Sequence, residues 1–185
     1  WTVPLPQSIL DPIPHDPQVG FSLNPFAKSL LGISSDASTL LVRRAPNEYG
    51  GYSAETGASI WNLTLNYPAQ SNQQICLWPT DNFIIFSPTD IAFKCYSIKT
   101  GALRWTSTSF NDAAWATTWT VYYSTTNDLE NMYAQFSDCT VRAYSLADGH
   151  EIWRSTPIPS TEYPNNVVPY VQNMLMVGGK IYSYA

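Results

Sequence analysis

A repeated motif constrains the fold of this chain more than any other feature of its sequence. Residues 51–61 (Gly-Tyr-Ser-Ala-Glu-Thr-Gly-Ala-Ser-Ile-Trp) align without gaps on residues 95–105, and a third copy occupies residues 143–153. The tryptophans that close the three copies are 44 and 48 residues apart. This spacing matches one four-stranded blade of a β-propeller, roughly 40 to 50 residues long. The sequence therefore predicts an all-β protein made of antiparallel four-stranded blades.

The composition and the local patterns agree with strands. Aromatic residues make up 14% of the chain and charged residues 12%, and short apolar runs end at Gly, Pro, Asn, Asp and Ser. No stretch shows the spacing of an amphipathic helix. We predict strands near residues 30–34, 39–43, 50–53 and 59–63, then 74–78, 83–86, 92–97 and 103–107, then 118–123, 131–136, 140–145 and 151–155, and finally 167–171, 174–177 and 180–184.

Two residue types in the motif have predictable structural roles. The glycine accepts a positive φ in the tight turn between the third and fourth strands, and the residues concerned are Gly57, Gly101 and Gly149. The tryptophan four residues later can lie flat against the neighbouring blade while its indole NH donates to a backbone carbonyl. The blade-docking residues predicted in this way are Trp61, Trp105 and Trp153.

The motif resembles the repeat of pyrroloquinoline-quinone dehydrogenases and their non-enzymatic relatives. In that repeat an Ala-aromatic-Asp strand leads into Thr-Gly and then Trp, and this chain has Ser53, Ser97 and Ser145 at the Asp position. The resemblance implies a propeller and agrees with the fold class predicted from the spacing. It does not select a function, because the same repeat builds enzymes, assembly factors and binding platforms.

The two ends of the sequence carry partial copies of the motif. Residues 1–6 resemble residues 153–159, which makes Trp1 a fourth candidate docking residue, and residues 181–185 resemble the strand that precedes the turn. Two arrangements of the single propeller domain, residues 1–185, remain open. In the first, the strand of Trp1 pairs with residues 180–184 and closes a four-bladed ring. In the second, which we favour, the chain is a segment of a larger propeller.

Quinone chemistry is not supported by the residues present. The adjacent Cys-Cys pair of the quinone enzymes is absent, and no Asp, Glu and Asn set matches their calcium and catalytic positions. We therefore predict no cofactor, no metal and no catalytic residue, and a non-catalytic structural or protein-interaction scaffold. Two alternatives remain: a fragment of a quinone-dependent oxidoreductase, and a carbohydrate-binding module that uses exposed aromatic residues such as Trp115 and Trp119.

The cysteines also argue against a metal site. Cys76, Cys95 and Cys139 lack the two close pairs of a zinc site, so they form either one disulfide and one free thiol or three reduced thiols.

Charge and apolar patterns restrict the partners. The net charge is −5 without a Lys/Arg cluster, which excludes a nucleic-acid surface, and no apolar run is long enough to span a membrane. We expect a protein partner, or self-association through open sheet edges. The glycosylation acceptor sequence at Asn62 and the low lysine content favour an extracellular or otherwise exported protein. Asn62 should then face solvent on an outer strand.

Overall fold

The computed structural model describes residues 29–45, 47–66, 74–77, 80–112, 122–136, 140–156 and 173–184. This part of the chain contains fourteen β-strands and no helix, so it offers no helix that could cross a membrane. The all-β class predicted from the repeat is confirmed.

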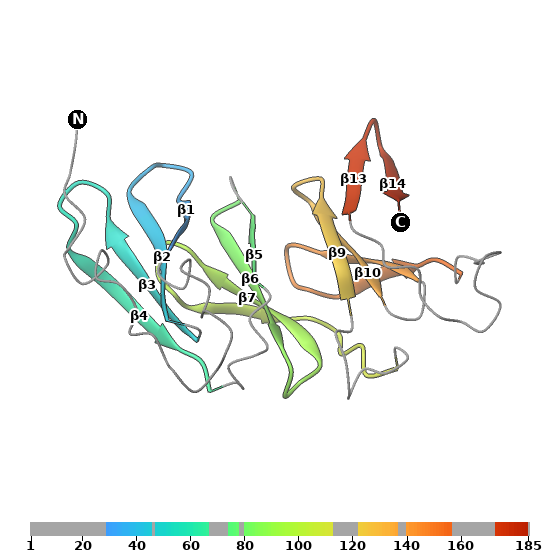
Figure 1. Ribbon diagram of the computed structural model, residues 1–185, viewed down its shortest axis with the longest axis horizontal. Helices are drawn as coiled ribbons and strands as arrows, with labels where there is room; N and C mark the ends of the chain where they lie inside the picture. The colour runs from blue at the N-terminus through green and yellow to red at the C-terminus, as the bar shows by residue number, and fades with distance from the viewer. Residues whose placement is uncertain are drawn as a thin grey trace, which may run out of the picture. The chain divides into compact units, whose positions relative to one another are not determined.

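Twelve of the strands form three four-stranded sheets in which sequential strands are neighbours (Figure 1). The first sheet contains β1 (Ser29–Ile33), β2 (Thr39–Ala45), β3 (Glu48–Ser53) and β4 (Ser59–Thr64). The second contains β5 (Gln74–Leu77), β6 (Asn82–Ser87), β7 (Ala92–Ser97) and β8 (Leu103–Thr106). The third contains β9 (Tyr122–Asn127), β10 (Asn131–Phe136), β11 (Val141–Ser145) and β12 (Glu151–Arg154). Each sheet therefore corresponds to one repeat.

A hairpin follows the three sheets. It consists of β13 (Asn173–Val177) and β14 (Lys180–Tyr184), joined by Gly178 and Gly179. Both glycines have positive φ, as a two-residue hairpin turn requires.

Most strands begin and end within two residues of their predicted limits. The exception is β9, which runs over 122–127 instead of the predicted 118–123. Its last residues are polar, and they belong to the strand because Thr125 and Thr126 pair with β10. Backbone pairing of this kind is not visible in a hydrophobicity pattern. The strand predicted at 167–171 lies outside the described residues.

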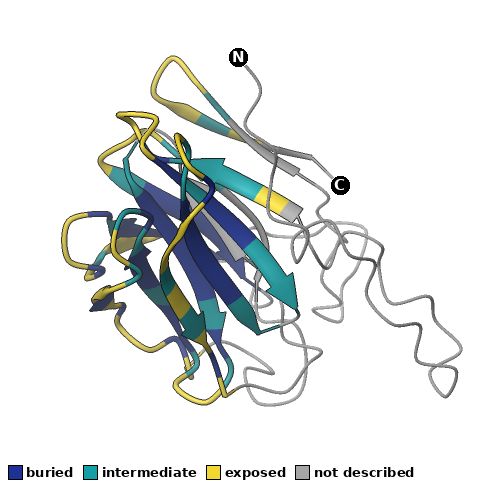
Figure 2. Cartoon of the chain, turned by 90° about the vertical axis from the view of Figure 1, so that its left-hand side faces the viewer, coloured by how far each residue is buried: buried dark blue, intermediate teal, exposed yellow. Residues whose placement is uncertain are grey.

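Burial explains why the middle strands read as apolar runs. In β6, Phe83, Ile84 and Ile85 are all buried although successive side chains point to opposite faces of the sheet. In β4, by contrast, Trp61 and Leu63 are half-buried while the residues between and after them are exposed. Figure 2 shows the buried residues concentrated in the strands and many of the exposed ones in the connecting loops.

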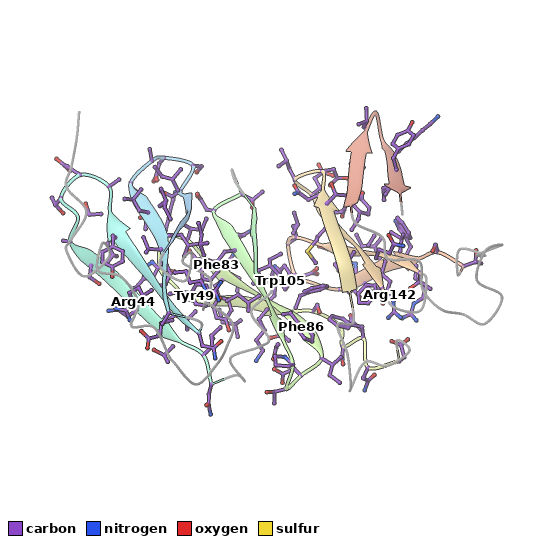
Figure 3. All side chains as sticks on the ribbon, in the orientation of Figure 1. Arg44, Tyr49, Phe83, Phe86, Trp105 and Arg142 are labelled. Atoms are coloured by element: carbon purple, nitrogen blue, oxygen red, sulfur yellow. The ribbon has the colours of Figure 1, made fainter. Side chains whose placement is uncertain are left out.

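The described residues divide into two compact units, and the boundary passes through the second sheet. Unit 1 takes its residues from 1–85 and 95–104, and unit 2 from 86–94 and 105–185. In unit 1, Tyr49 packs on Phe83 with ring centroids 5.7 Å apart (Figure 3). In unit 2, Phe93 contacts Phe110 at 4.9 Å. Each unit thus has its own aromatic core.

Candidate functional site

Unit 1 shows how the tryptophan of the first motif is used. The indole Nε1 of Trp61, on β4, donates a 2.9 Å hydrogen bond to the backbone carbonyl of Ile98. The indole stacks on Phe83 with 6.0 Å between ring centroids and 6° between ring planes. It also covers Gly101, where a Cβ atom would lie 2.6 Å from the ring. Because Gly101 belongs to the second motif, Trp61 connects successive repeats.

Unit 2 contains the same contact one repeat later. The Nε1 of Trp105 donates a 2.9 Å hydrogen bond to the backbone carbonyl of Leu146, and the side chain is only 7% exposed. A Cβ atom on Gly149 would lie 2.5 Å from this indole. Ile98 and Leu146 each follow the last strand residue of their own motif, so the two tryptophans use equivalent acceptors.

The glycine turns of the three motifs share one geometry. The φ angles of Gly57, Gly101 and Gly149 are +71°, +69° and +79°. Each glycine N–H donates to the carbonyl of the serine four residues earlier, at 2.8 to 2.9 Å. The side-chain oxygen of that serine accepts a further backbone N–H of the turn, at 3.1 to 3.3 Å. Serine therefore braces the turn in the place where the resemblance led us to expect aspartate.

A small residue beneath the tryptophan is a second shared feature, and sequence reasoning missed it. In the first sheet Trp61 pairs with Gly51, and a Cβ atom on Gly51 would overlap the indole nitrogen. In the third sheet Trp153 pairs with Ala143. The aligned residue of the second motif is Cys95. The signal was present in the sequence, because the residue ten positions before each motif tryptophan is Gly, Cys or Ala.

Cys95 has no sign of a chemical role. It is a free thiol, fully buried in β7, and burial raises its pKa to about 12. A thiol with so high a pKa is a poor nucleophile at neutral pH. Only Cys76 and Cys139 are left as partners for a disulfide, and neither side chain lies in the described part of the chain.

The outer strands of the first and third sheets share a β-bulge. In both strands the pairing shifts directly before the tryptophan, at Ile60 in β4 and at Ile152 in β12. Both isoleucines are exposed, by 51% and 45%. A bulge re-aims the residues that follow it, which places the tryptophan over the small residue of the neighbouring strand.

Trp153 is the motif tryptophan that differs. It contacts Tyr133 with ring centroids 5.9 Å apart, yet 42% of it is exposed. Met176 and Ile181 of the β13–β14 hairpin pack on the same core cluster as Tyr133, so the hairpin covers part of this sheet. Trp153 thus keeps the register of the docked tryptophans but not their burial.

A charged network connects the third sheet to the segment after β8. The Arg142 side chain (Figure 3) is completely buried. Its guanidinium lies 4.6 Å from the ring centroid of Phe136. Arg142 and Arg154 hold opposite oxygens of the Asp112 carboxylate, at 2.9 and 2.5 Å. Burial alone would raise the pKa of Asp112, but the hydrogen bonds from both arginines lower it to about 2. Glu151 lies 3.9 Å from Arg142 and 2.6 Å from Arg154, so the buried Arg142 cation has two carboxylate partners.

The remaining predicted site residues are placed as follows. Asn62 lies on β4 and is exposed, as a glycan acceptor requires, and its modification stays a prediction. Trp1, Trp115 and Trp119 lie outside the described residues, so the strand pairing of Trp1 and the carbohydrate-binding alternative stay predictions too.

No group of three or more His, Cys, Asp or Glu side chains that could hold a metal ion occurs in the described part of the chain.

Comparisons with known proteins agree with this architecture. The model of a family described as outer membrane protein assembly factor BamB matches residues 1–184. A search of curated proteins found no match. BamB from Moraxella catarrhalis is 17% identical with a TM-score of 0.45, covering 67% of this chain, which spans only 35% of that protein.

Two designed proteins have higher TM-scores. The computationally designed Ika4 protein is 9% identical with a TM-score of 0.54, over 88% of this chain and 94% of its own. The designed Ika8 protein is 9% identical with a TM-score of 0.53, over 85% of this chain and 42% of its own. At these identities the likeness concerns the fold alone.

Proposed function

Because this chain belongs to the family described as outer membrane protein assembly factor BamB, we propose that it is an exported, non-catalytic propeller segment that binds other proteins. The family description names an assembly factor, and assembly factors act through protein contacts. The fold supports the proposal, because a propeller presents rigid outer strands and loops on which contact residues can be held.

The observation that carries the proposal is the exposure of Trp153. Trp61 and Trp105 each bind a backbone carbonyl and cover a glycine turn of the next repeat. Trp153 has the same place in its motif and is 42% exposed. Tryptophan is among the commonest residues to dominate binding energy at protein interfaces. The partner that fits is therefore a protein segment that offers a carbonyl to Nε1 and a glycine-containing β-turn to the ring.

The described residues give less support to the quinone alternative. The buried thiol of Cys95 has a raised pKa. The Arg142 cation is paired with the carboxylates of Asp112 and Glu151, which also hold Arg154. These groups serve packing and ion pairing instead of presenting free ligands to a cofactor.

The proposal is tested by measuring association. Sedimentation velocity and light scattering report whether the secreted chain binds a second copy, and photo-crosslinking from position 182 on the neighbouring hairpin identifies a different protein. Trp153→Ala should reduce the association at least 10-fold, whereas Leu129→Ala, a change at another exposed apolar residue of unit 2, should leave it unchanged.

Two results would overturn the proposal. One is association that does not depend on Trp153. The other is binding of pyrroloquinoline quinone in the presence of calcium together with oxidation of an alcohol or sugar, which would favour the oxidoreductase alternative. A glycan-array signal that disappears on replacement of Trp115 or Trp119 would favour the carbohydrate-binding alternative instead.

A further inference from the structure

The three sheets end in outer strands that differ in protection. β4, β8 and β12 are each the last strand of their sheet, and among the described strands each pairs on one side only. A free strand edge presents unpaired N–H and C=O groups to which a strand of another molecule can add. Proteins limit such addition with short edge strands, charged side chains, prolines and bulges.

The outer strands of the second and third sheets have two of these protections, short length and charge. β8 and β12 are four residues long. β8 carries the exposed Arg104, and β12 carries Glu151 and Arg154. Charge therefore opposes strand addition at both edges.

The outer strand of the first sheet lacks both short length and charge. β4 has six residues, Ser-Ile-Trp-Asn-Leu-Thr, with no charged residue and no proline. Its bulge at Ile60 also occurs in β12, so the bulge does not distinguish the two strands. Ile60 is 51% exposed, and the composition is typical of strands that associate. By length and composition β4 is the outer strand most prone to strand addition.

The same strand carries the one glycosylation acceptor sequence of the chain. Asn62-Leu63-Thr64 is the only Asn-X-Ser/Thr sequence without proline among the 185 residues. Asn62 and Thr64 are exposed. Trp61, which precedes Asn62, and Leu63, which lies between the two, are half-buried. The side-chain amide nitrogen of Asn62 has a 3.4 Å contact with the hydroxyl of Ser59, which a small rotation would release.

We propose that Asn62 carries an N-linked glycan and that this glycan protects the edge of β4 in place of charge. The inference depends on the export part of the proposed function. The co-reactant is an oligosaccharide on a lipid pyrophosphate, supplied by the secretory pathway. The amide nitrogen forms a bond to C1 of the first sugar and gives up one proton, while the bond from C1 to the pyrophosphate oxygen breaks and the lipid pyrophosphate leaves.

Modification and edge protection are tested with one set of variants. The full chain is directed into a eukaryotic secretory pathway, and the purified protein is examined by peptide mapping and intact mass. The wild type and the control Thr64→Ser, which keeps the acceptor sequence, should each carry one glycan on Asn62. Asn62→Gln and Thr64→Ala should lack it and should associate at concentrations at least 10-fold below the wild type.

A fourth variant separates edge protection from folding. Asn62→Lys has no glycan but restores charge to β4, so it should remain as monomeric as the glycosylated protein. Thermal midpoints within two degrees of each other, expected for substitutions at an exposed site, exclude misfolding as the cause of association.

Three results would overturn the inference: a secreted wild type with an unmodified Asn62, an Asn62→Gln variant as monomeric as the wild type, or an Asn62→Lys variant that associates like Asn62→Gln. None of these results would affect the proposed binding at Trp153, because the two surfaces are altered by separate substitutions.

Discussion

Trp105 and Trp153, both in unit 2, hold the same position in successive motifs and have different surroundings. Trp105 is 7% exposed, with its nitrogen bonded to a carbonyl and its ring against Gly149. Trp153 is 42% exposed and contacts Tyr133. The motif therefore gives both tryptophans the same sequence position, with a small residue ten positions earlier, but the contact itself depends on a glycine turn being present. Trp105 should therefore contribute to stability and Trp153 to binding.

The largest expected effect is the loss of the buried tryptophan. Trp105→Ala removes a buried indole, its hydrogen bond and its contact with Gly149, and should lower the free energy of unfolding by about 3–5 kcal/mol. Urea denaturation followed by circular dichroism measures the change. A loss under about 1 kcal/mol would mean that the motif tryptophan does not hold the repeats together.

The glycine that receives Trp105 gives the next largest effect. Gly149→Ala places a Cβ atom 2.5 Å from the indole at a φ of +79°, so it should cost roughly 2–4 kcal/mol. Gly178→Ala is the matched control, because Gly178 has a φ of +57° but no atom within 4 Å of the added Cβ. In the control the free energy of unfolding should fall only by the cost of the backbone conformation, about 1–2 kcal/mol. Equal losses in urea denaturation would show that the ring contact contributes nothing.

Acid should weaken the charged network that holds β12, the strand of Trp153. The pKa of Asp112 is lowered to about 2 from an ordinary 3.8, so its stabilising effect is complete above pH 3.8 and is lost as the pH falls through 2. Asp112→Asn should therefore cost about 1 kcal/mol at neutral pH and almost nothing at pH 2. Thermal midpoints at pH 7, 4 and 2 measure this.

Glu55→Gln, in the β3–β4 turn and outside the network, is the control and should leave the acid dependence of the wild type unchanged. If the thermal midpoints of the wild type and the Asp112→Asn variant differed by the same amount at pH 7 and at pH 2, the role of the carboxylate would be contradicted.

The repeat made the fold predictable. Features that depend on contacts outside the repeated motif were not predictable from it. Four-stranded sheets, turn glycines and strand positions follow from a local pattern that occurs three times. The exposure of Trp153 does not follow, because it depends on what lies beside the third sheet and not on the motif. The Arg142 network was also missed, since Asp112 is thirty residues from Arg142 and only folding brings them together. The limits of β9 were missed because its polar half is fixed by pairing with β10.

The smallest expected effect on stability is the one that tests the comparison most directly. Trp153→Ala removes a half-exposed ring that contacts Tyr133, so it should lower the free energy of unfolding by about 1 kcal/mol or less. The same substitution should reduce protein association at least 10-fold, because an exposed tryptophan in a rigid sheet loses little entropy when a partner covers it. Tyr133→Leu removes the aromatic neighbour but leaves the indole, and should preserve most of the association. If Trp153→Ala instead destabilised the chain as much as Trp105→Ala, then Trp153 would be a structural contact like Trp105, and the division of the motif tryptophans into stabilising and binding residues would be wrong.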